Sequence, residues 1–186
     1  MIVLKAFLNR FLDKFERTWS YDAGYLRLVT RVQPKSAVKF VLGAAAADRG
    51  AAPAEAFAAV GVAGTLAEDC GPCTQIGVDM AAAAGVEPAV LRAILAGDEA
   101  GMGETAALAW RFARASLARD LAAADPLREE VVGRWGEEGL VALSLALVAA
   151  RMYPTLKYAL GYGRTCSRVI VAGEPAAVAH PALLAA

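Results

Sequence analysis

The chain has 186 residues, of which 58 % are hydrophobic, and its 19 basic and 19 acidic residues cancel at neutral pH. This length fits one domain with at most a terminal arm, and the balanced charge provides no overall field to attract nucleic acid or an anionic membrane. Alanine alone supplies 44 residues, which favours closely packed helices over sheet. We therefore expect an all-α fold, a compact multi-helix bundle, and no nucleic-acid partner.

Membrane and secretory segments are not expected from the sequence. The longest uncharged run near the end, GLVALSLALVAA (139–150), is shorter than the roughly 20 residues that a membrane-spanning helix needs. The first residues lack the separate basic region, apolar region and cleavage site of a secretory signal. Three cysteines in a chain of this length do not make a disulfide framework. The expected location is the cytoplasm, with no membrane span.

The helices are predicted from apolar spacing and from the positions of proline and glycine. Apolar residues at three- and four-residue spacings define one face of a helix over 4–15, which we expect to pack on the protein's own core or on a partner subunit. Proline and glycine then divide the rest of the chain. The expected helices are 21–32, 34–48, 53–68, 70–85, 87–96, 103–123, 126–133 (with Asp125 as its N-cap) and 136–160 (with a kink at Pro154), and 167–173 is expected to pair briefly as a strand.

The expected organisation is an N-terminal helical arm (1–33), a helical domain (34–173) and a loosely held tail (174–186). Within the domain we expect the other helices to pack around the helix that carries the cysteine pair and around a buried C-terminal helix. Residues 140–150 are apolar on every face of that last helix, and a small domain has few positions where a helix is buried all round. We therefore expect a homo-oligomer whose interface covers the remaining face.

The stretch AEDCGPCTQIGVDM (67–80) carries the strongest chemical signal. With Cys70 as N-cap, Gly71 and Pro72 fall in the first helical turn, where both residue types are tolerated. The Cys70 sulfur is then expected to accept a hydrogen bond from the Cys73 amide, in the positive end of the helix dipole. Two cysteines at this spacing lie close enough to form a disulfide. The local geometry suits a thiol pair that opens and closes.

Charged neighbours decide how reactive such a pair is. Residues 50–91 contain no Lys, Arg or His, so an activating cation must come from elsewhere in the fold. The C-terminal helix and the segment after it supply candidates: Arg151, Lys157, Arg164 and Arg168. Glu68 and Asp69 oppose a neighbouring thiolate. A partly buried Glu68 would instead take the thiol proton as a base, whereas the simpler interpretation of both acids is a solvated helix end.

Three other interpretations of the cysteines compete with the redox pair. A zinc site would require Cys70, Cys73, Cys166 and His180, but the last two lack the short ligand spacing of structural zinc sites. Two inert, buried cysteines are the second alternative, although Gly-Pro between them is poor material for a helix interior. Cys166 is expected to be a small buried hydrophobe, with a resolving or interface thiol as the other possibility. No metal and no cofactor are expected.

CGPC is also the thioredoxin tetrapeptide, but the βαβ context of that fold is missing. Three stretches, CGPCTQIGVDMAAAAGVEPAVLRAIL, TAALAWRFARASLA and WGEEGLVALSLALVAARMYPTLKYALGYG, resemble the alkylhydroperoxidase D-like and carboxymuconolactone decarboxylase family over most of 50–163. The resemblance implies a compact all-α subunit that forms oligomers. In redox members of that family, the cysteine pair reduces hydroperoxides and is recycled by a thiol or lipoyl partner protein.

The family's proton relay also includes a histidine one turn after the second cysteine and an acid about three helical turns before the first. Here Cys70 and Cys73 match the cysteines, the histidine position falls on Gly77, and the acid position falls near Ala58. The hypothesis is therefore a thiol-disulfide oxidoreductase or peroxidase-like protein that uses Cys70 and Cys73, with Glu68 as a possible base. A lyase or decarboxylase acting on a small carboxylate and a non-catalytic oligomeric scaffold remain the alternatives.

Overall fold

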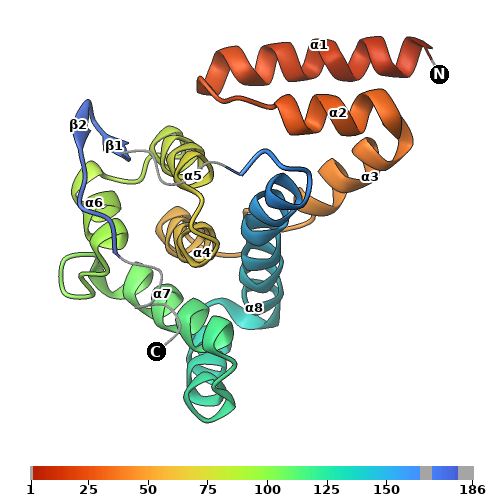
Figure 1. The fold of residues 1–186 in the computed structure, drawn as a ribbon. Helices are drawn as coiled ribbons and strands as arrows, with labels where there is room; N and C mark the ends of the chain where they lie inside the picture. Colours follow the sequence, from red (N-terminus) through yellow and green to blue (C-terminus); the bar gives the residue numbers. More distant parts are fainter. Residues whose placement is uncertain (1, 164–168, 180–186) are drawn as a thin grey trace.

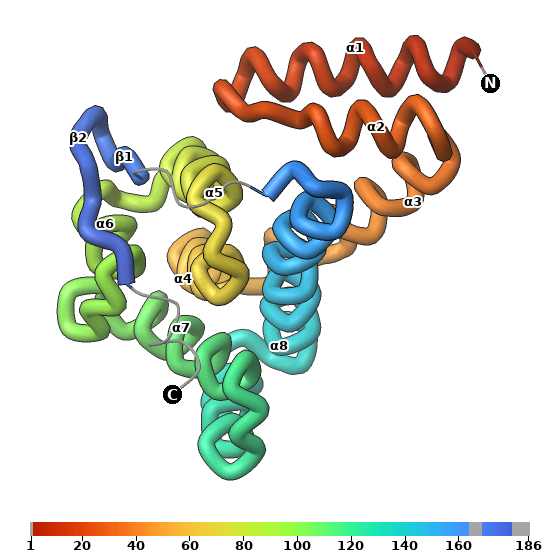
Figure 2. The backbone as a smooth tube through the Cα atoms, viewed as in Figure 1, coloured from red at the N-terminus to blue at the C-terminus, as the bar shows by residue number. Residues whose placement is uncertain are grey.

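The computed structural model describes residues 2–163 and 169–179. This part of the chain is almost entirely helical, as the composition predicts, with a single two-residue strand pair (Figure 1; Figure 2 shows the same path as a tube). The elements are α1 (Ile2–Trp19), α2 (Gly24–Val32), α3 (Pro34–Ala44), α4 (Ala54–Ala67), α5 (Gly71–Ala83), α6 (Pro88–Ala96), α7 (Gly103–Ala118), α8 (Leu121–Ala159), β1 (Ile170–Val171) and β2 (Glu174–Pro175).

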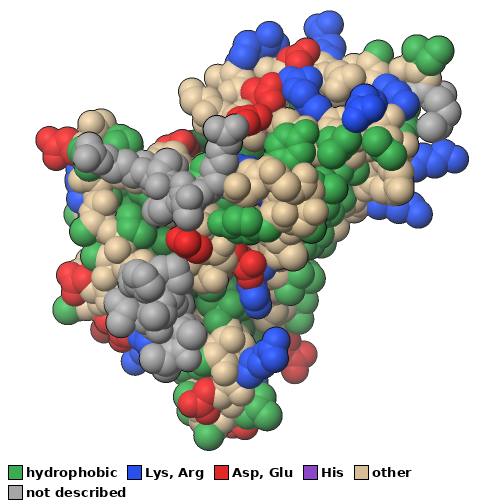
Figure 3. Space-filling model, viewed as in Figure 1, with side chains coloured by type: hydrophobic (Ala, Val, Ile, Leu, Met, Phe, Trp, Pro, Cys, Tyr) green, Lys and Arg blue, Asp and Glu red, His purple; other side chains and the backbone are tan. Residues whose placement is uncertain are grey.

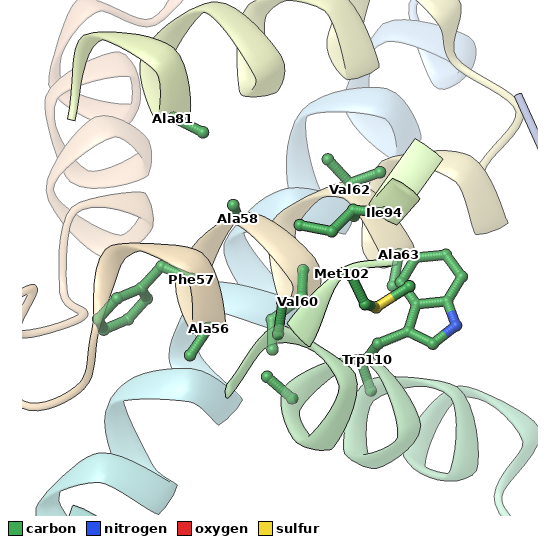
Figure 4. Packing of buried hydrophobic residues seen from close by; sticks show 14 of the residues in the cluster. Ala56, Phe57, Ala58, Val60, Val62, Ala63, Ala81, Ile94, Met102 and Trp110 are labelled. Atoms are coloured by element: carbon green, nitrogen blue, oxygen red, sulfur yellow. The ribbon is translucent and has the colours of Figure 1, made fainter. Parts of the chain in front are cut away.

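The body of the protein is built around α4, which packs against α5, α7 and α8. The all-α bundle is thus as predicted, but its central helix is α4 and not the cysteine helix α5. Its residues are apolar or small on nearly every side, so almost the whole helix is buried. Close approach to α8 depends on Gly64, where a Cβ atom would lie only 2.8 Å from the Cβ of Ala150. Figure 4 shows the resulting core, in which Trp110 and Met102 fill space beside the small side chains of α4.

The second half of α8 is the apolar helix that the sequence predicts, but one stripe of it is uncovered in the single chain. Val141 and Val148 are 57 % and 56 % exposed, and Leu145 between them is 37 % exposed. The opposite side, including Leu143 and Ala146, is buried against the body. By length and composition α8 could also cross a membrane; because core helices pass the same test, this is weak evidence for a span.

Helices α1, α2 and α3 form an arm beside the body, so the arm as we use the term here includes α3 and reaches beyond residue 33 (Figure 1). Many lysine and arginine side chains lie on this part of the surface in Figure 3. Arg27 of α2 bridges Asp13 and Glu16 of α1 and so fastens the two helices together. On α1, Leu8 and Leu12 are buried, whereas Phe7 and Phe11 are 68 % and 45 % exposed. Of the predicted apolar face, Leu8 and Leu12 thus pack on the protein itself, whereas Phe7 and Phe11 are uncovered in the single chain.

The arm contacts the body through a second buried cluster, separate from the core around α4. We call it the aromatic cluster. It joins the arm to α5 and α8, and its ring contacts include Tyr153 of α8 packed edge-on against Phe40 of α3, with ring centres 5.0 Å apart. Its buried members are Leu12, Tyr21, Ala23, Tyr25 and Leu26, and its partly buried members are Phe15, Trp19, Phe40, Ile76, Tyr153, Leu156 and Leu160.

Several helix ends differ from the prediction. Helix α7 ends at Ala118, because Arg119 adopts a left-handed conformation with φ of 58°. The next helix then starts at once, and its N-cap is Asp120, whose carboxylate accepts from the Ala123 amide at 3.1 Å; Asp125 is therefore not the N-cap. The predicted break between the last two helices is found at Gly136, where φ is 70°, while Pro154 keeps helical backbone angles.

The C-terminal hairpin lies against α5 and α6. The side chain of Gln75 hydrogen-bonds both the amide and the carbonyl of Ile170, at 2.7 and 3.0 Å, and Arg92 donates to the Val171 carbonyl. The short strand pairing predicted over 167–173 is thus found at Ile170–Val171. Within the predicted loose tail, Ala179 is buried and its amide donates to the Leu95 carbonyl, whereas 180–186 lie outside the described residues.

Candidate functional site

Cys70 and Cys73 form a disulfide at the beginning of α5. Cys70 is the N-cap, as predicted, and the two Cα atoms are 5.2 Å apart. Both cysteines are buried, with 3 % and 4 % of their surface exposed. The predicted hydrogen bond from the Cys73 amide to the Cys70 sulfur is not present among the described residues: Cys70 makes no side-chain cap bond, and its sulfur is joined to that of Cys73.

Two buried threonines fix the turn that presents the disulfide. The Thr74 hydroxyl lies 3.1 Å from the Thr65 hydroxyl and 3.1 Å from the Cys70 carbonyl, which it donates to, and so ties the end of α4 to the start of α5. The Cys70 amide donates to the Thr65 carbonyl. Asp69 between the helices adopts a left-handed conformation with φ of 48°. The disulfide is therefore held by a connection with little freedom.

Glu68 faces α8. One of its oxygens lies 2.6 Å from the Arg151 guanidinium, and the Thr155 hydroxyl lies 3.3 Å from the other. One of the predicted cations, Arg151, is thus used to pair this carboxylate. A base role for Glu68 in the cysteine chemistry stays a prediction, and the structure shows that such a base would begin from an ion pair.

A buried tyrosine of the arm contacts the disulfide. The Tyr21 hydroxyl lies 3.9 Å from Cys73 Sγ and 3.2 Å from the Tyr25 hydroxyl. The Lys157 ammonium of α8 lies over both rings, 5.1 Å from the centre of the Tyr21 ring and 5.8 Å from that of Tyr25. Tyr21, Tyr25 and Lys157 are 7 %, 1 % and 6 % exposed. We call these three residues the tyrosine–lysine cluster.

Burial determines the protonation of the tyrosines. Desolvation is the largest cause that raises the pKa of Tyr21 and of Tyr25, because a phenolate is poorly stabilised away from water. The pKa of Tyr153, a partly buried member of the aromatic cluster, is raised for the same reason. These hydroxyls therefore keep their protons over the whole physiological range. Tyr21 can donate a hydrogen bond to sulfur, but it is a poor proton acceptor.

Two of the four predicted cations, Arg151 and Lys157, lie within the described residues, and of these two Lys157 is next to Tyr21, which contacts the disulfide. The sequence predicted Lys157 as a candidate cation because of its position on the last helix, but it did not predict any role for Tyr21 or Tyr25. The only local signal was two tyrosines four residues apart, in the segment before α2 and on its first turn. The contact between Tyr21 and Cys73 joins positions 52 residues apart, and local periodicity carries no information about it.

The helix α5 leaves an open position where the family resemblance places a histidine. A Cβ atom added to Gly77 would meet no heavy atom within 4 Å in the described part of the protein. Asp79 beyond it accepts a hydrogen bond from Gln75 at 2.7 Å. Residues 2–163 and 169–179 contain no group of three or more His, Cys, Asp or Glu side chains suited to a metal ion. Cys166, His180, Arg164 and Arg168 lie outside the described residues.

Comparisons of the chain with protein-family models, with curated proteins and with solved structures found no match.

Proposed function

We propose that this protein is a thiol-disulfide oxidoreductase whose Cys70–Cys73 pair reduces a peroxide or a disulfide. The observation that carries the proposal is the disulfide itself, at the start of a helix and in contact with a buried hydroxyl. The positive end of the α5 dipole favours the thiolate form of a cysteine placed there. The resemblance to alkylhydroperoxidase D-like proteins, carried by the CGPC helix and the helices after it, supports the same chemistry.

The proposed reaction with a hydroperoxide proceeds in two steps. A cysteine thiolate attacks the terminal peroxide oxygen, the O–O bond breaks, and the alkoxide leaves and takes up a proton to become an alcohol. The second cysteine then attacks the sulfenic acid sulfur, and hydroxide leaves and is protonated to water as the disulfide forms. Two small thiols, or one reduced lipoyl group on a partner protein, restore the two cysteine thiols by exchange and become a disulfide themselves.

The direct test measures peroxide loss with dithiothreitol as the dithiol. We expect wild-type protein to consume hydrogen peroxide and an organic hydroperoxide catalytically, above the rate for dithiothreitol alone. Cys70→Ser and Cys73→Ser are each expected to abolish that excess rate, whereas Cys166→Ser, which removes the third thiol, serves as the matched control and should retain it. Equal rates for wild type and the two single variants would reject the proposal.

The burial of both sulfurs favours a second candidate, a disulfide that only crosslinks a non-catalytic scaffold. The two candidates differ in how easily the bond opens in the folded protein. Dithiothreitol at millimolar concentration should reduce an active-site pair within minutes under native conditions, as followed by the mass increase of two protons. A scaffold crosslink would stay closed until the protein is denatured.

The proposal includes a cytoplasmic homo-oligomer. The exposed stripe of Val141, Leu145 and Val148 on α8 supports self-association, since such a stripe costs free energy in water. A single charged substitution, Val148→Lys, should convert the oligomer to monomer, as measured by light scattering during size-exclusion chromatography. Lys substituted at Ala122, an exposed site on the first half of α8, is the control. A wild-type monomer at micromolar concentration would contradict this part.

A further inference from the structure

We propose that the N-terminal arm is part of the redox site: Tyr21 donates a hydrogen bond to the Cys73 thiolate of the reduced protein, and Lys157, which lies over the Tyr21 ring, strengthens that bond. This inference deepens the proposed function and rests on it in one respect, namely that the Cys70–Cys73 bond opens in the folded protein. It assigns the stabilised thiolate to Cys73, because Tyr21 contacts that sulfur.

The hydroxyl of Tyr21 is oriented by its neighbour. Either hydroxyl of the Tyr21–Tyr25 pair can be the donor between them. When Tyr25 donates to the Tyr21 oxygen, the proton of Tyr21 is available for the sulfur 3.9 Å away. A thiolate accepts such a bond more strongly than a disulfide sulfur does, because hydrogen bonds to ionised acceptors are about twice as strong. The contact in the oxidised protein should therefore shorten on reduction.

Lys157 acts as a positioning and charge-supplying residue rather than by touching the sulfur. Its ammonium lies over the faces of both tyrosine rings, where the ring quadrupole attracts a cation. A positive charge there makes the Tyr21 proton a better donor and favours a negative charge on the sulfur that the Tyr21 hydroxyl contacts. Because Lys157 is 6 % exposed, solvent screens this effect only weakly.

The other ionisable groups near Cys73 do not cancel this effect. Glu68 is paired with Arg151, so its negative charge is largely compensated. Asp69 is exposed, and water screens its charge. Asp22, whose negative charge acts on Tyr21, is exposed as well, so water also screens it. Among the described residues, the ionisable groups on the elements around Cys73 and Tyr21 are Tyr21, Asp22 and Tyr25 from the arm, Arg151, Tyr153, Lys157 and Tyr158 from α8, Glu68 and Asp69 from the turn before α5, and Asp79 further along α5.

A stabilised thiolate has a consequence for the chemistry. Whichever thiol opens the disulfide, the electron pair of the S–S bond leaves more readily on the sulfur whose thiolate is better stabilised. The Cys73 sulfur is then the better leaving group when the disulfide is reduced. In the reduced protein, a larger fraction of Cys73 than of Cys70 is in the thiolate form. The arm would thus provide part of what the histidine position, here Gly77, lacks.

The test uses full-length protein with one thiol. In the Cys70→Ser/Cys166→Ser background only Cys73 remains, and its alkylation by iodoacetamide is followed against pH by mass spectrometry. We expect Tyr21→Phe, which removes only the hydroxyl, to slow alkylation about tenfold at pH 7 and to move the midpoint of the pH profile upward. Lys157→Met should move it in the same direction, and Lys157→Arg should restore most of the wild-type profile.

The matched control is Tyr153→Phe, which removes the hydroxyl of a partly buried tyrosine in the same aromatic cluster and should leave the midpoint in place. A merely structural role for Tyr21 would change access to the sulfur, which alters the plateau rate at high pH without moving the midpoint. The inference is overturned if the midpoints of Tyr21→Phe and Lys157→Met coincide with that of the Cys70→Ser/Cys166→Ser protein. It is also overturned if Tyr153→Phe moves the midpoint as far as Tyr21→Phe does. If circular dichroism shows that Tyr21→Phe does not fold, the comparison of Lys157→Met with Lys157→Arg tests the inference instead.

These outcomes are separable from those of the proposed function. A shifted midpoint in a protein that consumes no peroxide and exchanges no disulfide would retain this inference and reject the enzyme. Peroxide turnover with an unshifted midpoint would retain the enzyme and reject the role of the arm.

Discussion

The two buried clusters of this protein, the core around α4 and the aromatic cluster, consist of different types of side chain. The core around α4 consists of alanine, valine, leucine and a few larger side chains such as Trp110, and its buried members carry no titratable group. The aromatic cluster between the arm and the body instead encloses the hydroxyls of Tyr21 and Tyr25 and lies under the Lys157 ammonium. Polar groups are costly to bury unless they are paired, so their concentration beside the disulfide points to chemistry there rather than to stability.

The comparison predicts that the core around α4 carries most of the global stability. Trp110→Ala removes the largest fully buried side chain and should lower the free energy of unfolding by about 3–5 kcal/mol. Denaturation by urea, followed by circular dichroism, measures this loss. Leu121→Ala, at a side chain that is 69 % exposed, is the control and should change it little. A loss below about 1 kcal/mol for Trp110→Ala would show that this core is not what holds the fold.

Alkaline pH should break the aromatic cluster and leave the core around α4 intact at first. Burial raises the pKa of Tyr21, Tyr25 and Tyr153 above the ordinary value of 10, so the folded state favours their neutral forms. Their contribution is complete below pH 10 and is lost as pH rises above it, by about 1.4 kcal/mol per tyrosine for each pH unit.

The measurement compares tyrosinate absorbance at 295 nm with helix content at 222 nm. We expect the buried tyrosines to ionise together, in a step accompanied by faster proteolysis within residues 2–32, while most of the helical signal remains. Ionisation of all tyrosines at pH 10 without any structural step would contradict the burial of these three.

Docking of the arm should depend on the buried stripe of α1. Leu12→Ala deletes a side chain that is 3 % exposed and should weaken docking by about 2–3 kcal/mol, near the low end for buried leucine because only one side of this helix is covered. Hydrogen exchange should then rise in α1 and α2 but not in α4 or α7. Phe7→Ala, at an exposed site on the same helix, is the matched control, and equal effects of the two substitutions would refute the assignment of faces.

Much of the fold was predictable, because its signals are local. Most helix bounds were predicted closely, because prolines mark the first turns and glycines mark many of the ends. The break at Gly136 was predicted in the same way. The start of α8 was missed because Arg119 takes a left-handed conformation, which is usually adopted by glycine or asparagine. The chain turns at Arg119, and the N-cap of α8 is Asp120, five residues before Asp125. An uncovered face on the apolar part of α8 was expected for a domain of this size, but which residues form it, Val141, Leu145 and Val148, depends on the packing of the neighbouring helices.

The site was predictable in part. The Cys70–Cys73 pair and the possible use of Lys157 followed from spacing and from the absence of cations in 50–91, whereas the contact of Tyr21 with Cys73 depends on how the arm folds back over α5. The pairing of Glu68 with Arg151 likewise joins positions 83 residues apart. Contacts of this kind are set by tertiary packing, and they determine which of several nearby charges acts on the sulfur.

Substitution of Gly77 should have the smallest effect on stability, and it tests most directly whether this position corresponds to the histidine position implied by the family resemblance. It lies in the interior of α5 and a Cβ atom would meet open space among the described residues, so Gly77→Ala should stabilise the protein by about 0.5–1 kcal/mol through the lower entropy of the unfolded chain. Gly77→His should stabilise it less, because histidine has a lower helix propensity than alanine.

The two variants should differ in chemistry. A histidine one turn after Cys73 would place a group that exchanges protons near neutral pH beside the redox pair, so Gly77→His should reduce peroxide faster than Gly77→Ala, with a new dependence on pH between 6 and 7. If the two variants have equal rates at all pH values, this position is not oriented toward the cysteines. The resemblance would then describe the arrangement of helices without the relay, and the tyrosine–lysine cluster would be the remaining source of thiolate stabilisation.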